Sequence, residues 1–194
     1  MATSLMSPQG SAEPPGASAA PRHIVLLGLP GSGKSTAGAL AAERLGWMFI
    51  DLDAAIEREA GMSVSEIFTS EGEAGFRVRE VRSTGRIAGD EQQRYVIAPG
   101  GGWVEDPENL RLLGTGVVSV YLRVSPLVAL GRMGASAASR PLIAGSQMAE
   151  QLRRLLRRRE SLYLQANHTV NVDSMTPDEV ADSIVALASW SPPD

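Results

Sequence analysis

Short apolar runs alternate with longer mixed stretches from residue 22 to the end of the chain. The apolar runs are rich in β-branched residues and are bounded by polar or glycine-rich segments, which is typical of strands buried on both faces of a parallel sheet. Alternation of such strands with helix-length segments predicts helices on both faces of that sheet. The expected strands are residues 23–27, 48–50, 95–98, 117–122 and 169–172.

Three polar residues mark the starts of expected helices. Ser63 and Thr176 are each followed three residues later by glutamate, which is the pattern of a capping box. Thr176 and Ser125 each precede a proline, a residue favoured at the first position of a helix. Other helices are expected over residues 35–45, 73–89 and 148–166.

The segment 148–166 carries a charge on its apolar side. When its residues are placed about 100° apart, its leucines and Tyr163 form one stripe, and Arg159 falls in the middle of it. The neighbouring arginines fall on the opposite side. Burying Arg159 unpaired would be costly, so it needs an anion. That anion is either an acidic residue of the protein or an acidic substrate.

The only lysine among the 18 basic residues is Lys34, directly after the first expected strand. It lies in GLPGSGKST, residues 28–36, which matches the phosphate-loop pattern G-x-x-x-x-G-K-S/T between a strand and a helix. A compact ammonium fits inside a ring of backbone amides around a phosphate, whereas a flat guanidinium does not. The loop therefore predicts nucleotide binding. The expected phosphate contacts are Gly31, Ser32, Gly33, Lys34, Ser35 and Thr36.

Magnesium chemistry is expected beside this loop. The Ser35 hydroxyl is placed to ligate Mg²⁺, and Asp51 and Asp53 follow the second expected strand. Residues two apart in an extended segment point to the same side, so both carboxylates are expected to face one cleft, Asp51 towards the metal and Asp53 towards an acceptor hydroxyl. The alternative is that the two acids cap the next helix.

Other polar and glycine residues have both chemical and structural explanations. Arg77 and Glu80, three residues apart on the helix 73–89, can pair, although most such pairs lie on the surface and contribute little. Residues 100–102 are three glycines that let a ligand approach the backbone, although a tight turn also uses glycine. His23 and His168 each open a strand and are expected to be structural.

Composition narrows the class of protein. The net charge of −4 argues against nucleic-acid binding, and the absence of cysteine excludes thiolate chemistry. No apolar run approaches the ~20 residues of a membrane span. Residues 1–21, rich in Ser, Ala, Pro and Gly, predict a disordered tail before a single domain over 22–191. A cytoplasmic, monomeric enzyme that does not bind membranes is expected.

The segment 133–146 consists mainly of small residues around Arg140-Pro141. Such a stretch can hardly pack a core, which favours a mobile lid. Its only charged side chain is Arg140, and an arginine suits a phosphate. An ordinary surface loop is the alternative.

Together these motifs resemble the shikimate kinases, phosphate-loop kinases of small molecules with a shape like that of nucleoside monophosphate kinases. The resemblance covers residues 23–190 and also rests on FIDLD at 49–53, SEIF at 65–68, RPL at 140–142 and Arg159 before Leu162-Tyr163. It implies a three-layer α/β/α fold with a five-stranded parallel sheet, a lid and a substrate-binding helical region. It also implies transfer of the γ-phosphoryl group of ATP, with Mg²⁺, to the 3-hydroxyl of shikimate.

By position, the resemblance assigns roles to the residues singled out above. The implied shikimate contacts are Asp53, Arg77, Gly101, Gly102 and Arg159. Glu80 would orient Arg77, Arg132 would lie near adenine, and Arg140 would close on the ATP phosphates. Lys34, Asp53 and Arg140 would be the catalytic residues. Two alternatives stay open: a kinase of the same shape that acts on gluconate, and a non-catalytic regulatory domain.

Overall fold

The computed structural model describes residues 21–134 and 147–188. The expected tail, apart from Pro21, and most of the expected lid, with Arg140, lie outside these residues. The five strands are β1 His23–Leu27, β2 Met48–Asp51, β3 Tyr95–Ala98, β4 Val117–Arg123 and β5 His168–Asn171.

The strands form one parallel sheet in the order β2-β3-β1-β4-β5. The five-stranded parallel sheet is therefore confirmed, with β1 at its centre and every residue of β1 buried. The last strand begins at His168 and ends at Asn171, one residue earlier at each end than expected. Val172 is nevertheless buried, and its N–H donates to the carbonyl of Arg123 at 2.9 Å.

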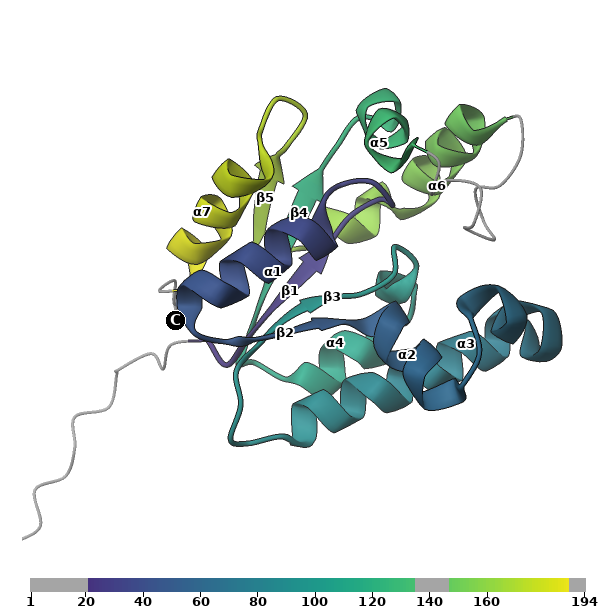
Figure 1. Cartoon of the computed structure of the whole chain (residues 1–194), viewed down its shortest axis with the longest axis horizontal. Helices are drawn as coiled ribbons and strands as arrows, with labels where there is room; N and C mark the ends of the chain where they lie inside the picture. Colours follow the sequence, from purple (N-terminus) through teal and green to yellow (C-terminus); the bar gives the residue numbers. More distant parts are fainter. Residues whose placement is uncertain (1–20, 135–146, 189–194) are drawn as a thin grey trace, which may run out of the picture.

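The connecting segments are helices. They are α1 Lys34–Leu45, α2 Leu52–Ala60, α3 Val64–Gly89, α4 Pro107–Leu113, α5 Pro126–Met133, α6 Met148–Tyr163 and α7 Pro177–Leu187, with a short 3₁₀ helix, η1, over Trp103–Glu105. In Figure 1, α1 and α7 lie side by side in front of the sheet, and Arg44 of α1 pairs with Asp178 and Asp182 of α7. Helices α3 and α4 lie together beneath β2 and β3 in the same view.

The expected helix starts are confirmed. Ser63 and Thr176 both form complete capping boxes, and Ser125 caps α5 ahead of Pro126. The helix expected from residue 73 is the second part of α3, which bends at Gly72, where φ is 72°. Only glycine adopts that left-handed backbone freely.

Helix α6 ends at Tyr163, earlier than the expected residue 166. The N–H groups of Gln165 and Ala166 donate to carbonyls three residues back, at 3.1 Å each, so the chain tightens into a turn before β5. Over the described part of the chain, no helix is both long and apolar enough to cross a membrane.

Candidate active site

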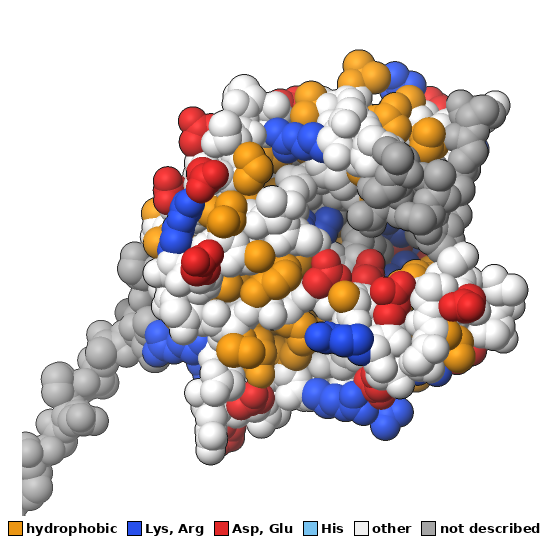
Figure 2. All heavy atoms as spheres, in the orientation of Figure 1, with side chains coloured by type: hydrophobic (Ala, Val, Ile, Leu, Met, Phe, Trp, Pro, Cys, Tyr) orange, Lys and Arg blue, Asp and Glu red, His pale blue; other side chains and the backbone are white. Residues whose placement is uncertain are grey.

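A cavity of about 800 Å³ lies at the carboxyl edge of the sheet, where ligands bind in open α/β folds. The space-filling view shows the molecule hollowed near its centre, with basic side chains inside the hollow and acidic side chains along one rim (Figure 2). Except for Arg140, which lies outside the described residues, every site residue expected from the sequence lines this cavity. They are Gly31, Ser32, Gly33, Lys34, Ser35, Thr36, Asp51, Asp53, Arg77, Gly101, Gly102, Arg132 and Arg159.

The phosphate loop holds Lys34 folded against its own backbone. The Lys34 ammonium donates to the carbonyls of Gly28 and Leu29, at 2.9 and 3.0 Å, and the residue is 9% exposed. Gly31 has φ of 80°, and a Cβ there would lie 2.4 Å from the carbonyl oxygen of Ala129. The loop therefore needs glycine at this position, and its lysine lies at the N-terminal end of α1.

Ser35 and Asp51, which both line the cavity, are hydrogen-bonded to each other. The Ser35 hydroxyl donates to Asp51 Oδ2 at 2.6 Å, and the N–H of Ala54 donates to Asp51 Oδ1 at 3.2 Å. Asp51 thus caps α2, which was the alternative explanation, and its other carboxylate oxygen also faces the loop. A hydroxyl and a carboxylate beside a phosphate loop suit Mg²⁺, which keeps several waters and uses few protein ligands. The described residues contain no group of three or more acidic or histidine ligands around one point.

The geometry expected for Asp53 is wrong. Strand β2 ends at Asp51, and Asp53 lies in the first turn of α2 rather than in an extended segment. Asp53 still lines the cavity because the first turn of α2 brings it against Gly100, where an added Cβ would lie 2.8 Å from Asp53 Oδ1. Asp51 and Asp53 therefore do line the same cleft, but Asp53 is placed there by the first turn of α2 and not by strand alternation.

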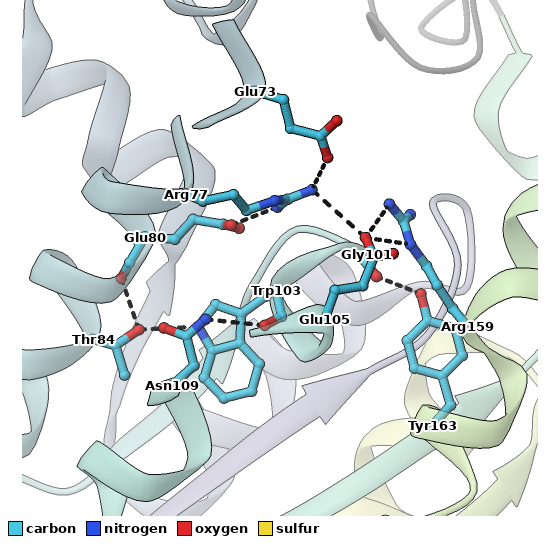
Figure 3. Close-up of polar contacts among 10 residues, drawn as sticks. All are labelled: Glu73, Arg77, Glu80, Thr84, Gly101, Trp103, Glu105, Asn109, Arg159 and Tyr163. Atoms are coloured by element: carbon cyan, nitrogen blue, oxygen red, sulfur yellow. Dashed lines mark hydrogen bonds and ion pairs between the residues drawn. The ribbon is translucent and has the colours of Figure 1, made fainter. Parts of the chain in front are cut away.

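Arg77 lies between two acids of its own helix (Figure 3). Its Nη1 is 2.5 Å from Glu80 Oε2, and its Nη2 is 2.9 Å from Glu73 Oε1. Glu80 is fully buried, and desolvation raises the pKa of its carboxyl to about 7, although the charge of Arg77 acts in the opposite direction. The pair is therefore not an ordinary surface pair, because it fixes the guanidinium from the buried side.

Arg159 is 1% exposed, as expected of a residue on the apolar side of α6. Of the two partners left open by the sequence, the structure shows a protein acid, since Glu105 Oε2 lies 3.0 Å from Arg159 Nε and 2.8 Å from Nη2. The same oxygen is 3.8 Å from Arg77 Nη2. The other oxygen of Glu105 is 2.6 Å from Nε of Arg158. Two elements far apart in the sequence, α3 and α6, thus meet through one carboxylate (Figure 3).

Glu105 is held at this point by η1, which the sequence did not predict. The buried Trp103 donates its indole N–H to Thr84 of α3 at 2.9 Å, and Thr84 in turn donates to the carbonyl of Glu80 at 2.8 Å. Asn109 donates to the carbonyl of Trp103 at 3.0 Å. The only signal in the sequence was the tryptophan directly after three glycines.

The glycine run is shaped by what packs against it. A Cβ on Gly102 would lie 2.2 Å from Arg77 Nη2 and 2.8 Å from Arg159 Nη2, so both guanidinium groups reach the backbone there. The carbonyl of Gly101 accepts a hydrogen bond from the Tyr163 hydroxyl at 2.5 Å. These contacts go beyond what a simple turn requires.

Arg132 lies at another part of the cavity wall, with Met175, Pro177 and Val180. Its Nη2 donates to the carbonyls of Val172 and Met175, at 2.5 and 3.1 Å, so it supports the loop after β5. His23 and His168 do not line the cavity. His23 is buried against the Tyr95 ring, and burial lowers its pKa. The structural role expected of His23 fits this position.

Comparison with known proteins gives consistent matches. The family model of shikimate kinase matches residues 30–189. A shikimate kinase of Synechococcus sp. (strain CC9605) is 42% identical over 166 residues, which cover 86% of this chain and 82% of that protein.

Comparison with solved structures also matches a shikimate kinase. The structure of a shikimate kinase from Acinetobacter baumannii in complex with shikimate has a TM-score of 0.80 and 33% identity, and covers 88% of this chain and 93% of that one. A gluconokinase from Sinorhizobium meliloti, at 22% identity and a TM-score of 0.58, covers 87% of this chain and 92% of that one and shares the fold alone.

Proposed function

The chain belongs to the shikimate kinase family and is an ATP-dependent kinase of shikimate, and we propose that the cavity described above carries the transfer of the γ-phosphoryl group to the 3-hydroxyl. The observation that carries this proposal is that one cavity contains both a phosphate-loop lysine and a pair of inward-facing arginines. The first feature suits the donor nucleotide, and the second suits an acceptor that bears a carboxylate.

At the donor end, the loop residues 31–36 surround the ATP phosphates. Lys34 exchanges its two carbonyl contacts for the phosphates when the nucleotide binds, since an ammonium on a flexible stem can rotate between them. Arg132 and the apolar residues near it form the adenine end of the cavity. Arg140 closes on the phosphates, in the role that the family resemblance gives it.

Ser35 and Asp51 are the residues that would hold Mg²⁺, and their contact at 2.6 Å supports this assignment. When bound, the cation supplies neutralisation of phosphate charge. Phosphate oxygens and water would complete its coordination, because Mg²⁺ in kinase sites uses one or two carboxylates and keeps the rest of its shell.

At the acceptor end, Arg77 and Arg159 hold the shikimate carboxylate, with Glu80 orienting Arg77. Guanidinium groups match carboxylates in shape and bind them by paired hydrogen bonds. Gly101 and Gly102 let the ring approach the backbone. Asp53, beside Gly100 on the same wall, holds the ring hydroxyls.

Catalysis rests on positioning and charge neutralisation. The 3-hydroxyl oxygen forms a bond to the γ-phosphorus while the bond from that phosphorus to the bridging β–γ oxygen breaks, and ADP leaves. Asp53 accepts the hydroxyl proton. Lys34 and Arg140 stabilise the negative charge on the phosphoryl oxygens as the transfer proceeds.

We further propose a monomer in the cytoplasm with one kinase domain over residues 22–191. The main competing acceptor is gluconate, another hydroxylated acid, which the arginine pair would also accept. A non-catalytic regulatory domain fits less well, because both Asp51 and Asp53 line the cavity.

The experiment is a coupled assay of ADP formation with ATP, Mg²⁺ and shikimate. ADP should form only when shikimate is present, and ³¹P NMR should show one new phosphomonoester. ADP formation at the rate of the control without acceptor would end the claim that this chain is an enzyme.

A further inference from the structure

Glu105 occupies the point where the two acceptor-binding arginines converge. Its Oε2 is 2.8 Å from Arg159 Nη2 and 3.8 Å from Arg77 Nη2, and both guanidinium groups also reach Gly102. An incoming carboxylate that binds both arginines needs the same position. Figure 3 shows the glutamate side chain between the two arginines.

Two carboxylates cannot share this position at low cost. Oε2 already takes two donors of Arg159, Nε and Nη2. A second carboxylate beside it would meet a like charge in a partly desolvated site, where the side chain of Glu105 is 16% exposed and that of Arg159 only 2%. The acceptor must therefore displace the Glu105 side chain from Arg159.

The backbone of Glu105 cannot supply that displacement easily. Its N–H donates to the carbonyl of Gly102 at 3.0 Å, and Trp103, two residues before it, is fully buried and bonded to α3. The side chain, however, has three rotatable bonds and already touches a second cation outside the cavity wall. Arg158 Nε lies 2.6 Å from Oε1, and the Arg158 side chain is 64% exposed. Rotation towards Arg158 keeps Glu105 paired.

We propose that Glu105 is a built-in competitor of the acceptor's carboxylate: it pairs with Arg159 in the free protein and moves to Arg158 when shikimate binds. Glu105 thereby sets the affinity for the acceptor and keeps the buried Arg159 neutralised between turnovers. The proposal rests on the proposed function, since it takes Arg77 and Arg159 to be the acceptor's carboxylate site.

Whether shikimate affinity rises or falls when the Glu105 charge is removed distinguishes a competitor from a residue that only orients Arg159. A competitor that is removed lets shikimate bind more tightly, whereas the loss of a residue that orients Arg159 weakens binding. Glu105→Gln keeps the shape and removes the charge. It should lower the dissociation constant for shikimate about tenfold and leave that for ATP unchanged.

The test is isothermal titration of shikimate into the wild-type protein and into Glu105→Gln. Glu108→Gln is the matched control, because Glu108 pairs with the exposed Arg111 on α4, outside the cavity lining. The methyl ester of shikimate is the second ligand. Lacking the carboxylate charge, it should bind wild type and Glu105→Gln about equally. A Glu105→Gln protein that binds shikimate equally or more weakly would overturn the proposal.

A second variant tests the alternative position of the glutamate. Arg158→Gln should weaken shikimate binding about threefold to fivefold in the wild-type background and have little effect in the Glu105→Gln background, because the two residues act as a pair. Equal weakening in both backgrounds would mean that Arg158 acts only through its general charge and would remove it from the proposal.

Shikimate binding and turnover by the wild-type protein distinguish a failure of the proposed function from a failure of the role proposed for Glu105. If wild type neither binds nor phosphorylates shikimate, the proposed function fails first. If wild type does both and Glu105→Gln binds no more tightly, only the role of Glu105 is wrong.

Discussion

Arg77 and Glu80, three residues apart on α3, form a buried ion pair with 2.5 Å between Nη1 and Oε2. The carboxylate is fully buried, while the arginine side chain is 18% exposed and lines the cavity. Above pH 7, where Glu80 is ionised, removing one partner would leave an uncompensated charge, which costs far more than a surface pair contributes. The buried Glu80 therefore holds the Arg77 guanidinium in one orientation at the cavity wall.

Glu80 should make the stability of the protein depend on pH. Burial raises its pKa from 4.5 to about 7, so between these values the folded protein holds a proton that the unfolded chain has lost. The contribution is complete below pH 4.5 and is lost as pH rises past 7. The free energy of unfolding of wild type should therefore fall by about 3 kcal/mol more than that of Glu80→Gln between pH 4.5 and 8. Urea denaturation at each pH measures both.

Glu73→Gln is the control for this comparison, because Glu73 pairs with the same arginine from an exposed position, with 45% of its side chain accessible. It should keep the pH dependence of wild type. Parallel curves for wild type and Glu80→Gln would show that Glu80 is ionised throughout this range.

Lys34→Arg should abolish turnover. The lysine is enclosed by the loop, with its ammonium on two carbonyls, and a larger planar cation does not fit there. We expect kcat to fall by at least about a thousandfold, with shikimate binding retained. Arg111→Lys, an exposed exchange of the same two residue types, should leave kcat unchanged. Substantial activity in Lys34→Arg would mean that the lysine does not reach the phosphates.

Arg159→Ala should raise the KM for shikimate by about a hundredfold or more and that for ATP only slightly. Arg159 lies at the acceptor side of the cavity, while the phosphate loop connects the end of β1 to the start of α1. The measurement is steady-state kinetics with each substrate varied in turn. If both KM values rise equally, Arg159 supports the fold through Glu105 and does not bind the acceptor.

Gly102→Ala should also weaken shikimate binding, because the change in the backbone residue displaces the two arginines. Its new methyl group would lie 2.2 Å from Arg77 Nη2 and 2.8 Å from Arg159 Nη2 and would push both away. We expect the KM for shikimate to rise about tenfold or more and the melting temperature to fall, because the displaced arginines are paired with the buried Glu80 and with Glu105.

Gly85→Ala provides the comparison. An added Cβ at Gly85 in α3 meets only Leu112 Cδ1, at 3.9 Å. This variant should keep its kinetics and gain about 0.5–1 kcal/mol of stability, since alanine favours the helix. Unchanged acceptor kinetics in Gly102→Ala would show that the arginines do not need the space beside the glycine.

Much of the fold could be predicted from short segments of the sequence. The phosphate loop and the capping residues Ser63 and Thr176 depend on contacts within a few residues, so their positions could be predicted closely. The five strands could be located because each is a short apolar run in the sequence, although they pair with distant strands. The inward position of Arg159 could also be predicted, because the helical period alone places it on the apolar side.

The partner of Arg159 could not be predicted in the same way. Glu105 is 54 residues away, in a short 3₁₀ helix with no periodic pattern, and it reaches Arg159 only because Trp103 fastens that helix to α3. Asp53 shows a related limit. Strand alternation was expected to place Asp53 in the cavity. Its position there depends instead on where β2 ends and on the first turn of α2. Such packing follows from tertiary structure and not from the local sequence.

The most direct measurement is kcat/KM for shikimate and for gluconate, each at a saturating ATP concentration with Mg²⁺. A cavity in which Asp53, the glycine run and the arginine pair hold a rigid ring acid should favour shikimate by at least about a hundredfold, because a flexible open-chain acid loses more conformational freedom on binding. Preference for shikimate, with loss of that preference in Arg159→Ala, is the predicted result. Faster turnover of gluconate, or equal values for both acids, would contradict the assignment of the acceptor.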